Sequence, residues 1–183
     1  VGDVLIGAAQ TIAEYNGVHK AAHIKDKLIE MNHLNETLYC GSLSCAAEGH
    51  AEPSGTWCVD TLLANVAKQN VTRFPYEIAR LAQDIAGGLM VTLPSEADFK
   101  SPETGPMLQQ YFQGSQAVPV PNRMRILRLI ENLTLGTAAV GYLTESMHGA
   151  GSPQAQRIMI ARQVDMKDKQ HHAKKLCGID ADR

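Results

Sequence analysis

Apolar residues recur at spacings of three and four along most of the chain, which is the period of an α-helix with one buried face. The first 15 residues predict a helix, which Gly17 ends. A second helix is predicted from about residue 20 to 47, and its apolar stripe consists of Ala21, Ile24, Leu28, Met31, Leu34, Leu38 and Cys45. Such a helix would be roughly 40 Å long, which is typical of a strut in a helical bundle.

The middle of the chain predicts a helical hairpin followed by a long excursion. Glycine, proline and serine mark a loop over residues 48–56. Helices are expected at 60–72 and 75–86, with Leu62, Leu63, Val66, Ile78, Leu81 and Ile85 facing inward and Gly87-Gly88 as the stop. Residues 89–121 carry five prolines, so only one short helix is expected there, near 107–112. Long ordered loops are usually functional.

The last third predicts a further helix that Asn122 caps and whose second half, 136–141, is built of small residues. The stretch 144–157 then combines a helix end, a glycine loop and a new helix start. Ser152 before Pro153 is typical of an N-cap followed by proline at the first helical position, and the exposed N–H groups there would suit an anionic ligand. An ordinary helix-to-helix connection is the alternative. No long segment alternates with a period of two, so the chain is predicted to be all-α.

Glycines and charged side chains gather in that stretch. Glu145 and His148 are expected to lie at the loop. Gly149 and Gly151 would allow a tight turn and leave the backbone open to a ligand.

Composition limits the partners. The 183 residues suit one domain, 1–183, and the net charge of −2 with scattered basic residues gives no footprint for nucleic acid or an anionic membrane. Neither a signal peptide nor a run of roughly 20 apolar residues is present, so a cytoplasmic protein is expected. The irregularly spaced cysteines predict reduced thiols.

Val1 is not a methionine and a helix starts at once, which indicates that the chain is cut from a longer protein.

Two patterns of histidine and cysteine could indicate a metal site, but we assign a metal to neither. His33, Cys40 and Cys45 could be soft ligands, but such residues within an amphipathic helix usually pack, and further thiolates are not placed nearby. His19 and His23 share a helix face without a third ligand at a suitable spacing. No metal ligand is therefore predicted in this chain.

Several stretches resemble the C-terminal domain of the 4-hydroxybutyryl-CoA dehydratase (vinylacetyl-CoA Δ-isomerase) family. They are Asn32–Tyr39, Ala64–Tyr76, Asp84–Thr92, Pro94–Asp98 and Thr144–Arg157, and the resemblance extends over nearly the whole chain. That family belongs with the 4-hydroxyphenylacetate 3-hydroxylase flavoproteins and is similar in fold to the acyl-CoA dehydrogenases. The resemblance implies that residues 1–183 are the C-terminal helical bundle of a larger flavoenzyme, with a four-helix core and extra helices.

The resemblance also implies an activity. The full-length enzyme would be a homotetramer or dimer with FAD and a [4Fe–4S] cluster. It would convert the acyl-CoA substrate 4-hydroxybutyryl-CoA reversibly to crotonyl-CoA by a radical route and isomerise vinylacetyl-CoA, in 4-aminobutyrate or succinate fermentation. The family's cluster ligands precede the position of Val1, so this chain alone is expected to carry neither cluster nor activity.

Site residues follow from the acyl-CoA dehydrogenase pattern Glu-Gly-Thr/Ser-x-Gln, which matches Ala150–Gln154. Ser152 and Gln154 take the flavin-contact role, and Gly149 and Ala150 would contact substrate. Ala150 stands where those dehydrogenases have their base. Glu145, the one carboxylate in the stretch, is the candidate catalytic acid or base, and a structurally paired carboxylate is the alternative.

A second dehydrogenase element, Gln-x-x-Gly-Gly, matches Asp84 to Gly88. Gly87 and Gly88 would let the backbone approach the adenosine end of FAD across a subunit interface, and a plain helix C-cap is the alternative. Asp84, in the glutamine position, is expected to face sugar, because an acid beside a pyrophosphate is unfavourable.

Two other functions remain open. One is an FADH2-dependent aromatic hydroxylase of the 4-hydroxyphenylacetate 3-hydroxylase type, in which reduced FAD reacts with oxygen and which would lack the upstream cluster-binding segment. The other is a non-catalytic helical oligomerisation module.

Overall fold

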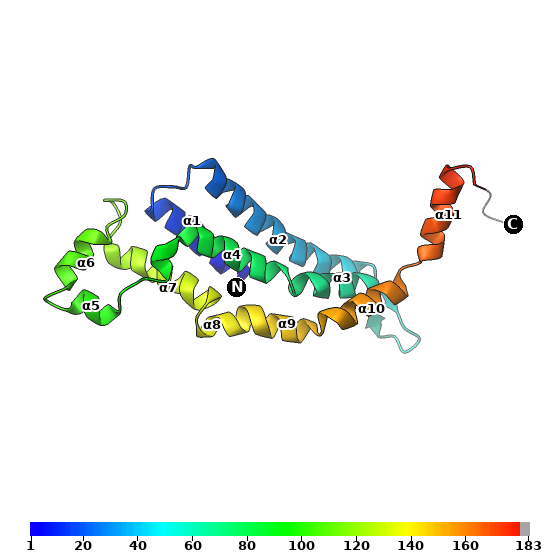
Figure 1. Ribbon diagram of the computed structural model, residues 1–183. Helices are drawn as coiled ribbons and strands as arrows, with labels where there is room; N and C mark the ends of the chain where they lie inside the picture. The colour runs from blue at the N-terminus through cyan, green and yellow to red at the C-terminus, as the bar shows by residue number, and fades with distance from the viewer. Residues whose placement is uncertain (180–183) are drawn as a thin grey trace.

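Four helices form the core of the computed structural model, which describes residues 1–179 (Figure 1). They are α1 (Gly2–Tyr15), α2 (Ala22–Ala47), α4 (Phe74–Ala86) and α7 (Val120–Thr134). Helix α1 packs against the other three, and α4 also packs against α2 and α7. The predicted all-α fold with a four-helix core is confirmed.

The apolar faces of these helices meet in one hydrophobic core. Its largest fully buried side chains are Leu5, Ile12, Met31, Ile78, Leu127 and Ile130. Burying one such side chain contributes about 1.5–3 kcal/mol, so this cluster is the main source of stability. Along α2 the predicted stripe is buried as far as Leu34, whereas Leu38 and Cys45 are half-buried because the far end of α2 packs mainly on one neighbour, α3 (Thr61–Val71).

Helices α3 and α4 are present as predicted, and Ile78, Leu81 and Ile85 of α4 are buried as expected. The predicted hairpin is wrong, because the two helices lie end to end along α2 and do not fold back on each other (Figure 1). Asp60 caps α3 by accepting a hydrogen bond from the Leu63 amide at 2.7 Å. None of the residues of α3 is fully buried, and Val66 is 39% exposed. The predicted inward orientation of Val66 is therefore wrong, because α3 extends beyond the four-helix core.

The loop predicted at 48–56 contains a small antiparallel hairpin, β1 (His50–Ala51) and β2 (Trp57–Cys58). Strands of two residues are too short to show an alternating pattern, so the sequence did not predict them. A three-residue turn closes the hairpin with Gly55 at φ +84°, and the Gly55 amide donates to the Glu52 carbonyl at 2.8 Å.

The excursion between α4 and α7 holds more helix than predicted. It contains η1 (Gly88–Met90), α5 (Glu96–Lys100) and α6 (Gly105–Tyr111). Helix α6 corresponds to the predicted short helix. Helix α5 was missed, although Ser95 and Asp98 form a capping box, which is a recognisable helix start.

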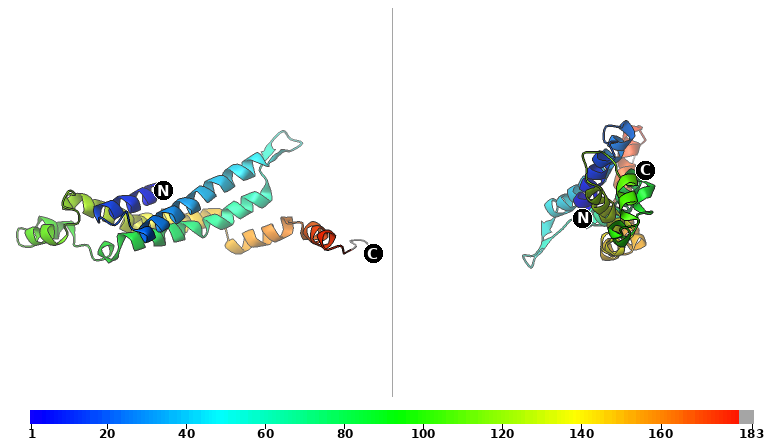
Figure 2. Two further views of the ribbon diagram at one scale, coloured as in Figure 1. Left: turned by 90° about the horizontal axis from the view of Figure 1, so that it is seen from above. Right: turned by 90° about the vertical axis from the view of Figure 1, so that its left-hand side faces the viewer.

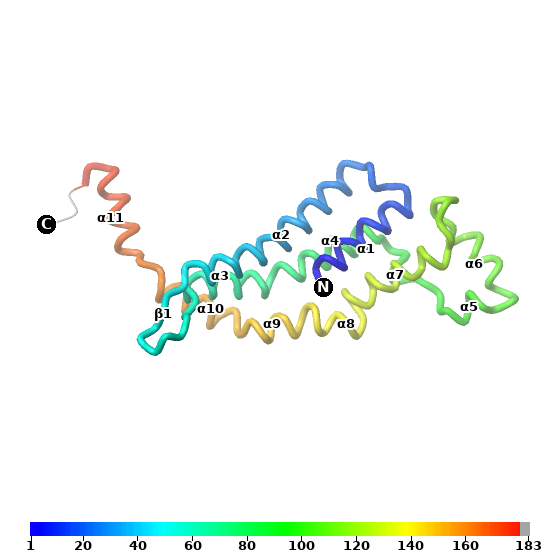
Figure 3. The backbone as a smooth tube through the Cα atoms, turned by 180° about the vertical axis from the view of Figure 1, so that it is seen from behind, coloured from blue at the N-terminus to red at the C-terminus, as the bar shows by residue number. Residues whose placement is uncertain are grey.

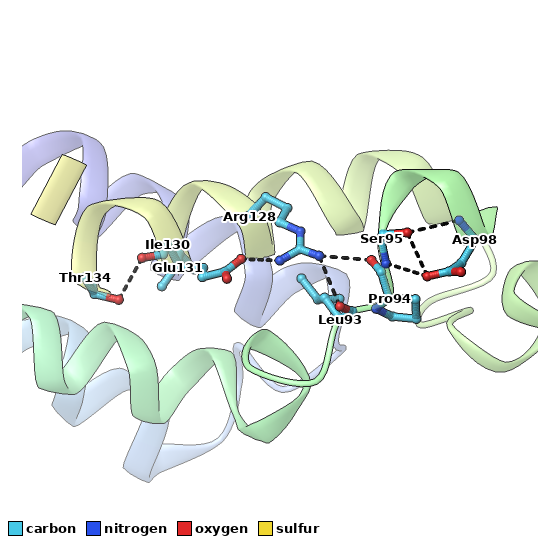
Figure 4. A network of polar contacts seen from close by, with 8 residues as sticks. All are labelled: Leu93, Pro94, Ser95, Asp98, Arg128, Ile130, Glu131 and Thr134. Atoms are coloured by element: carbon cyan, nitrogen blue, oxygen red, sulfur yellow. Dashed lines mark hydrogen bonds and ion pairs between the residues drawn. The ribbon is translucent and has the colours of Figure 1, made fainter. Parts of the chain in front are cut away.

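Two arginines of α7 fasten the excursion to the bundle, and the first, Arg123, donates to the Phe112 carbonyl at 2.8 Å. Arg128 of α7 donates to the carbonyls of Leu93 and Pro94, at 3.1 and 2.9 Å, and pairs with Glu131 (Figure 4). These hydrogen bonds to main-chain carbonyls hold the excursion against α7.

The helix after the excursion was mispredicted at both ends. It begins at Val120 rather than Asn122, because Pro121 fits the first turn, where no N–H partner is needed. It ends at Thr134, since Leu135 and Gly136 leave the helical conformation. The small-residue stretch instead starts a new run of helix, in which α8 (Thr137–Ala139), the π-helical η2 (Val140–Thr144) and α9 (Glu145–Ala150) follow one another without a break.

Two further helices end the described chain, α10 (Pro153–Gln163) and α11 (Met166–Leu176). Helix α10 packs on α3, whereas α11, coloured red, projects away from the bundle (Figures 1 and 3). The view from above shows a long, narrow molecule (Figure 2). Among residues 1–179, no helix has both the length and the apolar character needed to cross a bilayer.

Candidate functional site

The predicted catalytic loop joins α9 to α10. Gly151, at φ +93°, makes the turn, as expected. Gly149 does not turn the chain, because it lies in the last turn of α9, and that part of the prediction was wrong. A Cβ atom at Gly149 would meet no heavy atom within 4 Å. The backbone of Gly149 is therefore open to a ligand.

Ser152 and Pro153 occupy the predicted N-cap and first helical positions of α10. The Ser152 side chain makes no capping hydrogen bond, so Ser152 occupies the N-cap position through its backbone conformation alone. Ser152 and Gln154 are both exposed, and within residues 1–179 neither side chain is hydrogen-bonded. Both side chains are free to contact a ligand.

Glu145 begins α9 directly after the π-helical segment η2. A π-helical turn shifts the register of a helix, and such turns are frequent at functional sites. The side chain of Glu145 is exposed, and no ion pair among residues 1–179 includes it. Glu145 and Gly149 are four residues apart and so share one face of α9, which places an unpaired carboxylate beside the open backbone.

Tyr142 anchors η2 in the core. It is 8% exposed, and burial, followed by the negative charge of Asp3, raises the pKa of Tyr142 to about 12. Asp3 itself accepts a hydrogen bond from the Asn35 amide at 2.8 Å, which links α1 to α2. The segment that leads to Glu145 is thus fixed by a neutral, buried phenol.

Gln156, which sequence analysis did not single out, holds the loop. Its side chain is 3% exposed, and Nε2 donates to the carbonyls of Ala150 at 2.6 Å and Gly151 at 3.2 Å. Its Oε1 atom is buried without a partner among the described residues. The sequence does not distinguish Gln156 from the exposed Gln154, since only packing separates them.

The second predicted element lies at the C-terminal end of α4. Gly87 ends this helix at φ +73°, so the C-cap alternative accounts for its conformation. A Cβ atom on Gly87 or Gly88 would meet nothing within 4 Å. Asp84 already has a partner, because Lys27 Nζ lies 2.6 Å from its carboxylate.

The structure does not bring these two elements together within one chain. Gly88 begins η1, which packs on α7, whereas the α9–α10 loop lies beside α3, towards the other end of the bundle (Figure 1). The two elements are therefore separate parts of the surface of one chain.

The cysteines and histidines of α2 do not form a ligand set for a cluster. His33 Nδ1 lies 3.3 Å from a Glu30 carboxylate oxygen, and Cys45 Sγ donates to the Ser42 carbonyl at 3.1 Å. Among residues 1–179 the one group of three candidate metal ligands consists of His50, Glu52 and Cys58. The residues described therefore do not fit a [4Fe–4S] cluster, which needs four ligands.

Comparison with known proteins places this fold in a family. The model of the HpaB family, 4-hydroxyphenylacetate 3-hydroxylase C terminal, matches residues 1–178. The chain is 60% identical over 187 residues to the 4-hydroxybutyryl-CoA dehydratase/vinylacetyl-CoA-Delta-isomerase of Clostridium aminobutyricum, covering 98% of this chain and 38% of that protein. It is 27% identical over 133 residues to the oxygenase component of a Thermus thermophilus 4-hydroxyphenylacetate 3-monooxygenase, covering 73% and 27%.

Two solved structures have the same fold. An oxygen-tolerant archaeal 4-hydroxybutyryl-CoA dehydratase from N. maritimus superimposes with a TM-score of 0.93 at 64% identity, covering 100% of this chain and 37% of that one. The oxygenase component of a 4-hydroxyphenylacetate 3-monooxygenase, complexed with FAD and 4-hydroxyphenylacetate, gives a TM-score of 0.84 at 22% identity, covering 96% and 36%. The chain thus spans less than two-fifths of the length of each of these relatives.

Proposed function

The chain belongs to the 4-hydroxyphenylacetate 3-hydroxylase C-terminal family. Within this family, we propose that it is the C-terminal bundle of a 4-hydroxybutyryl-CoA dehydratase and vinylacetyl-CoA Δ-isomerase. The observation that carries the proposal is the 60% identity over 98% of the chain to the protein of that name. Since the chain spans 38% of that relative, domains outside residues 1–183 would supply the rest of the active site.

FAD is part of the proposal. A family member of the same fold is described as complexed with FAD. The chain offers suitable groups, because Ser152 and Gln154 are exposed without internal partners and Gly87 and Gly88 leave open space beside the backbone. Ser152 and Gln154 would hold the flavin bound to one subunit. Gly87 and Gly88 would contact the adenosine end of the FAD bound to a neighbouring subunit. When bound, FAD would supply one-electron chemistry.

Self-association follows from the same arrangement. The glycine pair and the α9–α10 loop lie in different parts of one chain, so a complete flavin site requires a second copy. We infer a dimer or tetramer for the full-length enzyme. In that assembly Asp84 would face the ribose with its charge already balanced by Lys27 at 2.6 Å.

Glu145 is the proposed acid/base group. It lies one turn from Gly149, on the helix face where the backbone is open, so an acyl chain placed along Gly149 and Ala150 would have this carboxylate beside it. Glu145 would accept or return a proton at the carbon chain of the substrate. Ala150 would leave space for the acyl group that a larger side chain would obstruct.

The [4Fe–4S] cluster of the proposed enzyme is assigned to segments outside this chain, because the described residues do not assemble its ligands.

Aromatic hydroxylation is the second candidate, and the 27% identity to a 4-hydroxyphenylacetate 3-monooxygenase component favours it. The experiment that separates the two uses the full-length protein, purified without oxygen. It is supplied with 4-hydroxybutyryl-CoA or vinylacetyl-CoA, or with 4-hydroxyphenylacetate, FADH2 and oxygen. Formation of crotonyl-CoA supports the proposal, whereas hydroxylation alone contradicts it. A flavin-free, inactive assembly would indicate an oligomerisation module.

A further inference from the structure

We propose that His50, Glu52 and Cys58 form a zinc-binding site on the β1–β2 hairpin. One potential ligand atom from each of the three side chains lies within 4.8 Å of the other two. Imidazole nitrogen, carboxylate oxygen and thiolate sulfur are the three donor types that bind Zn²⁺ in proteins. This site is separate from the proposed acyl-CoA chemistry and does not depend on it.

The register of the hairpin explains why these side chains converge. His50 and Cys58 are cross-strand partners, so their side chains project from the same face of the two strands. Glu52 follows His50 by two residues and therefore projects from that face as well. The Glu52 amide donates to the Thr56 carbonyl at 2.8 Å, which continues the strand pairing as far as the turn.

The backbone that carries the ligands is anchored at its base. Trp57 Nε1 donates to the Ala46 carbonyl at 3.1 Å, and the Asp60 amide donates to the Cys45 carbonyl at 2.8 Å. A Cβ atom on Gly49 would lie 2.5 Å from the Cys58 carbonyl oxygen, so the two ends of the hairpin approach closely only because this residue is glycine. The ligand positions are thus held by contacts with the end of α2.

The separation of the His50 and Glu52 ligand atoms suits a tetrahedral ion, and Cys58 Sγ lies within 4.8 Å of both. Ligand atoms 2.0–2.2 Å from zinc in tetrahedral geometry are separated by about 3.4 Å. His50 Nε2 and Glu52 Oε1 form a hydrogen bond at 3.2 Å, so zinc would replace the shared proton with little change in the separation of the two atoms. Cys58 would complete a three-ligand set and leave the fourth position to water.

The donor set also selects the metal. Mg²⁺ and Ca²⁺ prefer oxygen ligands only, and an iron–sulfur cluster needs four ligands that are mainly thiolates. One nitrogen, one oxygen and one sulfur favour Zn²⁺ among the common cellular ions. Bound zinc would cross-link two very short strands, which are marginally stable by themselves.

The test adds Zn²⁺ alone to the full-length protein and measures retained zinc by mass spectrometry and its ligands by zinc K-edge absorption. The protein treated with Zn²⁺ is expected to retain one more zinc per chain than the untreated protein, with a Zn–S distance near 2.3 Å. Cys58→Ser should abolish the sulfur contribution, and both Cys58→Ser and His50→Ala should weaken binding about tenfold or more. Cys45→Ser is the matched control, because Cys45 is also half-buried but lies outside the three-ligand group.

A chemical measurement makes the test independent of variant folding. Zinc should slow alkylation of Cys58 in the unmodified protein and leave the rate at Cys45 unchanged. Zinc binding that Cys58→Ser and His50→Ala leave intact would overturn the proposal. Equal protection of both cysteines, or no retained zinc in the parental protein, would also overturn it. Dehydratase activity is not a readout here, so failure of this site leaves the proposed function standing.

Discussion

The side-chain amide of Gln156 donates to the carbonyl oxygen of Ala150 at 2.6 Å, across the turn between α9 and α10. The same nitrogen reaches the Gly151 carbonyl at 3.2 Å. The loop that carries the proposed flavin and substrate contacts is therefore fixed by a buried side chain as well as by the glycine conformation.

Replacing Gln156 by glutamate should destabilise the protein. The change keeps the side-chain shape but turns the donor toward both carbonyls into a buried acceptor. We expect the free energy of unfolding in urea to fall by about 2 kcal/mol or more. Gln154→Glu, on the exposed side of the same helix, should change it by less than about 0.5 kcal/mol. Equal effects of the two changes would show that Gln156 does not hold the loop.

Arg128→Met should loosen the excursion between α4 and α7. The substitution removes the donors to the Leu93 and Pro94 carbonyls, so amide hydrogen exchange in residues 93–112 should accelerate by about tenfold, the equivalent of roughly 1.4 kcal/mol. Arg125→Met is the control, because Arg125 is exposed on the same helix and makes no hydrogen bond within residues 1–179. Similar exchange in both variants would contradict this function of Arg128.

The extent to which the sequence predicted the fold depended on element length. Helices α1, α2, α4 and α7 were predictable because each repeats apolar residues over several turns, as Ile24, Leu28 and Met31 do. The hairpin around His50 spans too few residues for a pattern. The break at Leu135–Gly136 also escaped prediction, because small residues such as those at 137–139 are compatible with a continuous helix.

The candidate site was predictable where local rules apply. Ser152 and Pro153 begin a helix as such a pair usually does, and a positive φ at Gly151 was expected from the loop. The burial of Gln156 and the π-helical turn before Glu145 depend on packing between helices distant in sequence, which no local pattern encodes.

Alkaline pH should weaken the protein through Tyr142. Its folded-state pKa of about 12 lies above the ordinary value of 10.0, so the folded protein favours the neutral phenol. The stabilisation that this preference gives is complete below pH 10 and is lost as the pH rises toward 12. By pH 11 the free energy of unfolding should have fallen by about 1 kcal/mol. Urea unfolding between about pH 9 and 11 should therefore show a steeper loss for the parent than for Tyr142→Phe. Tyr111→Phe, at a 73% exposed residue, should match the parent.

Gly88→Leu should separate stability from cofactor binding. A side chain at Gly88 would enter open space, so the unfolding free energy should change little. In the full-length enzyme the leucine would stand where the neighbouring subunit's FAD is proposed to lie, and retained flavin and the fraction of assembled oligomer should both fall. Gly7→Leu, also at an open helical glycine, is the control and should keep both. Full flavin retention in Gly88→Leu would contradict the shared site.

Ala150→Glu tests the space left beside the proposed acid/base group. A carboxylate at this position would restore the pattern of the acyl-CoA dehydrogenases. We expect crotonyl-CoA formation to fall, because the longer side chain would occupy the space proposed for the acyl chain. Ala155→Glu, on the exposed surface of α10, is the control and should have little effect. An Ala150→Glu enzyme of parental activity would show that the substrate does not pass this residue.

The proposed acid/base role of Glu145 is tested most directly by the rate at which full-length Glu145→Gln converts 4-hydroxybutyryl-CoA to crotonyl-CoA, with retained FAD measured on the same samples. Glutamine keeps the size of the side chain but cannot exchange the proton. Glu103→Gln, at an exposed carboxylate in the excursion, is the control and should keep the parental rate. A loss of about 100-fold or more is expected in Glu145→Gln, with the flavin intact. Turnover near the parental rate would contradict this expectation and leave Glu145 without a catalytic role.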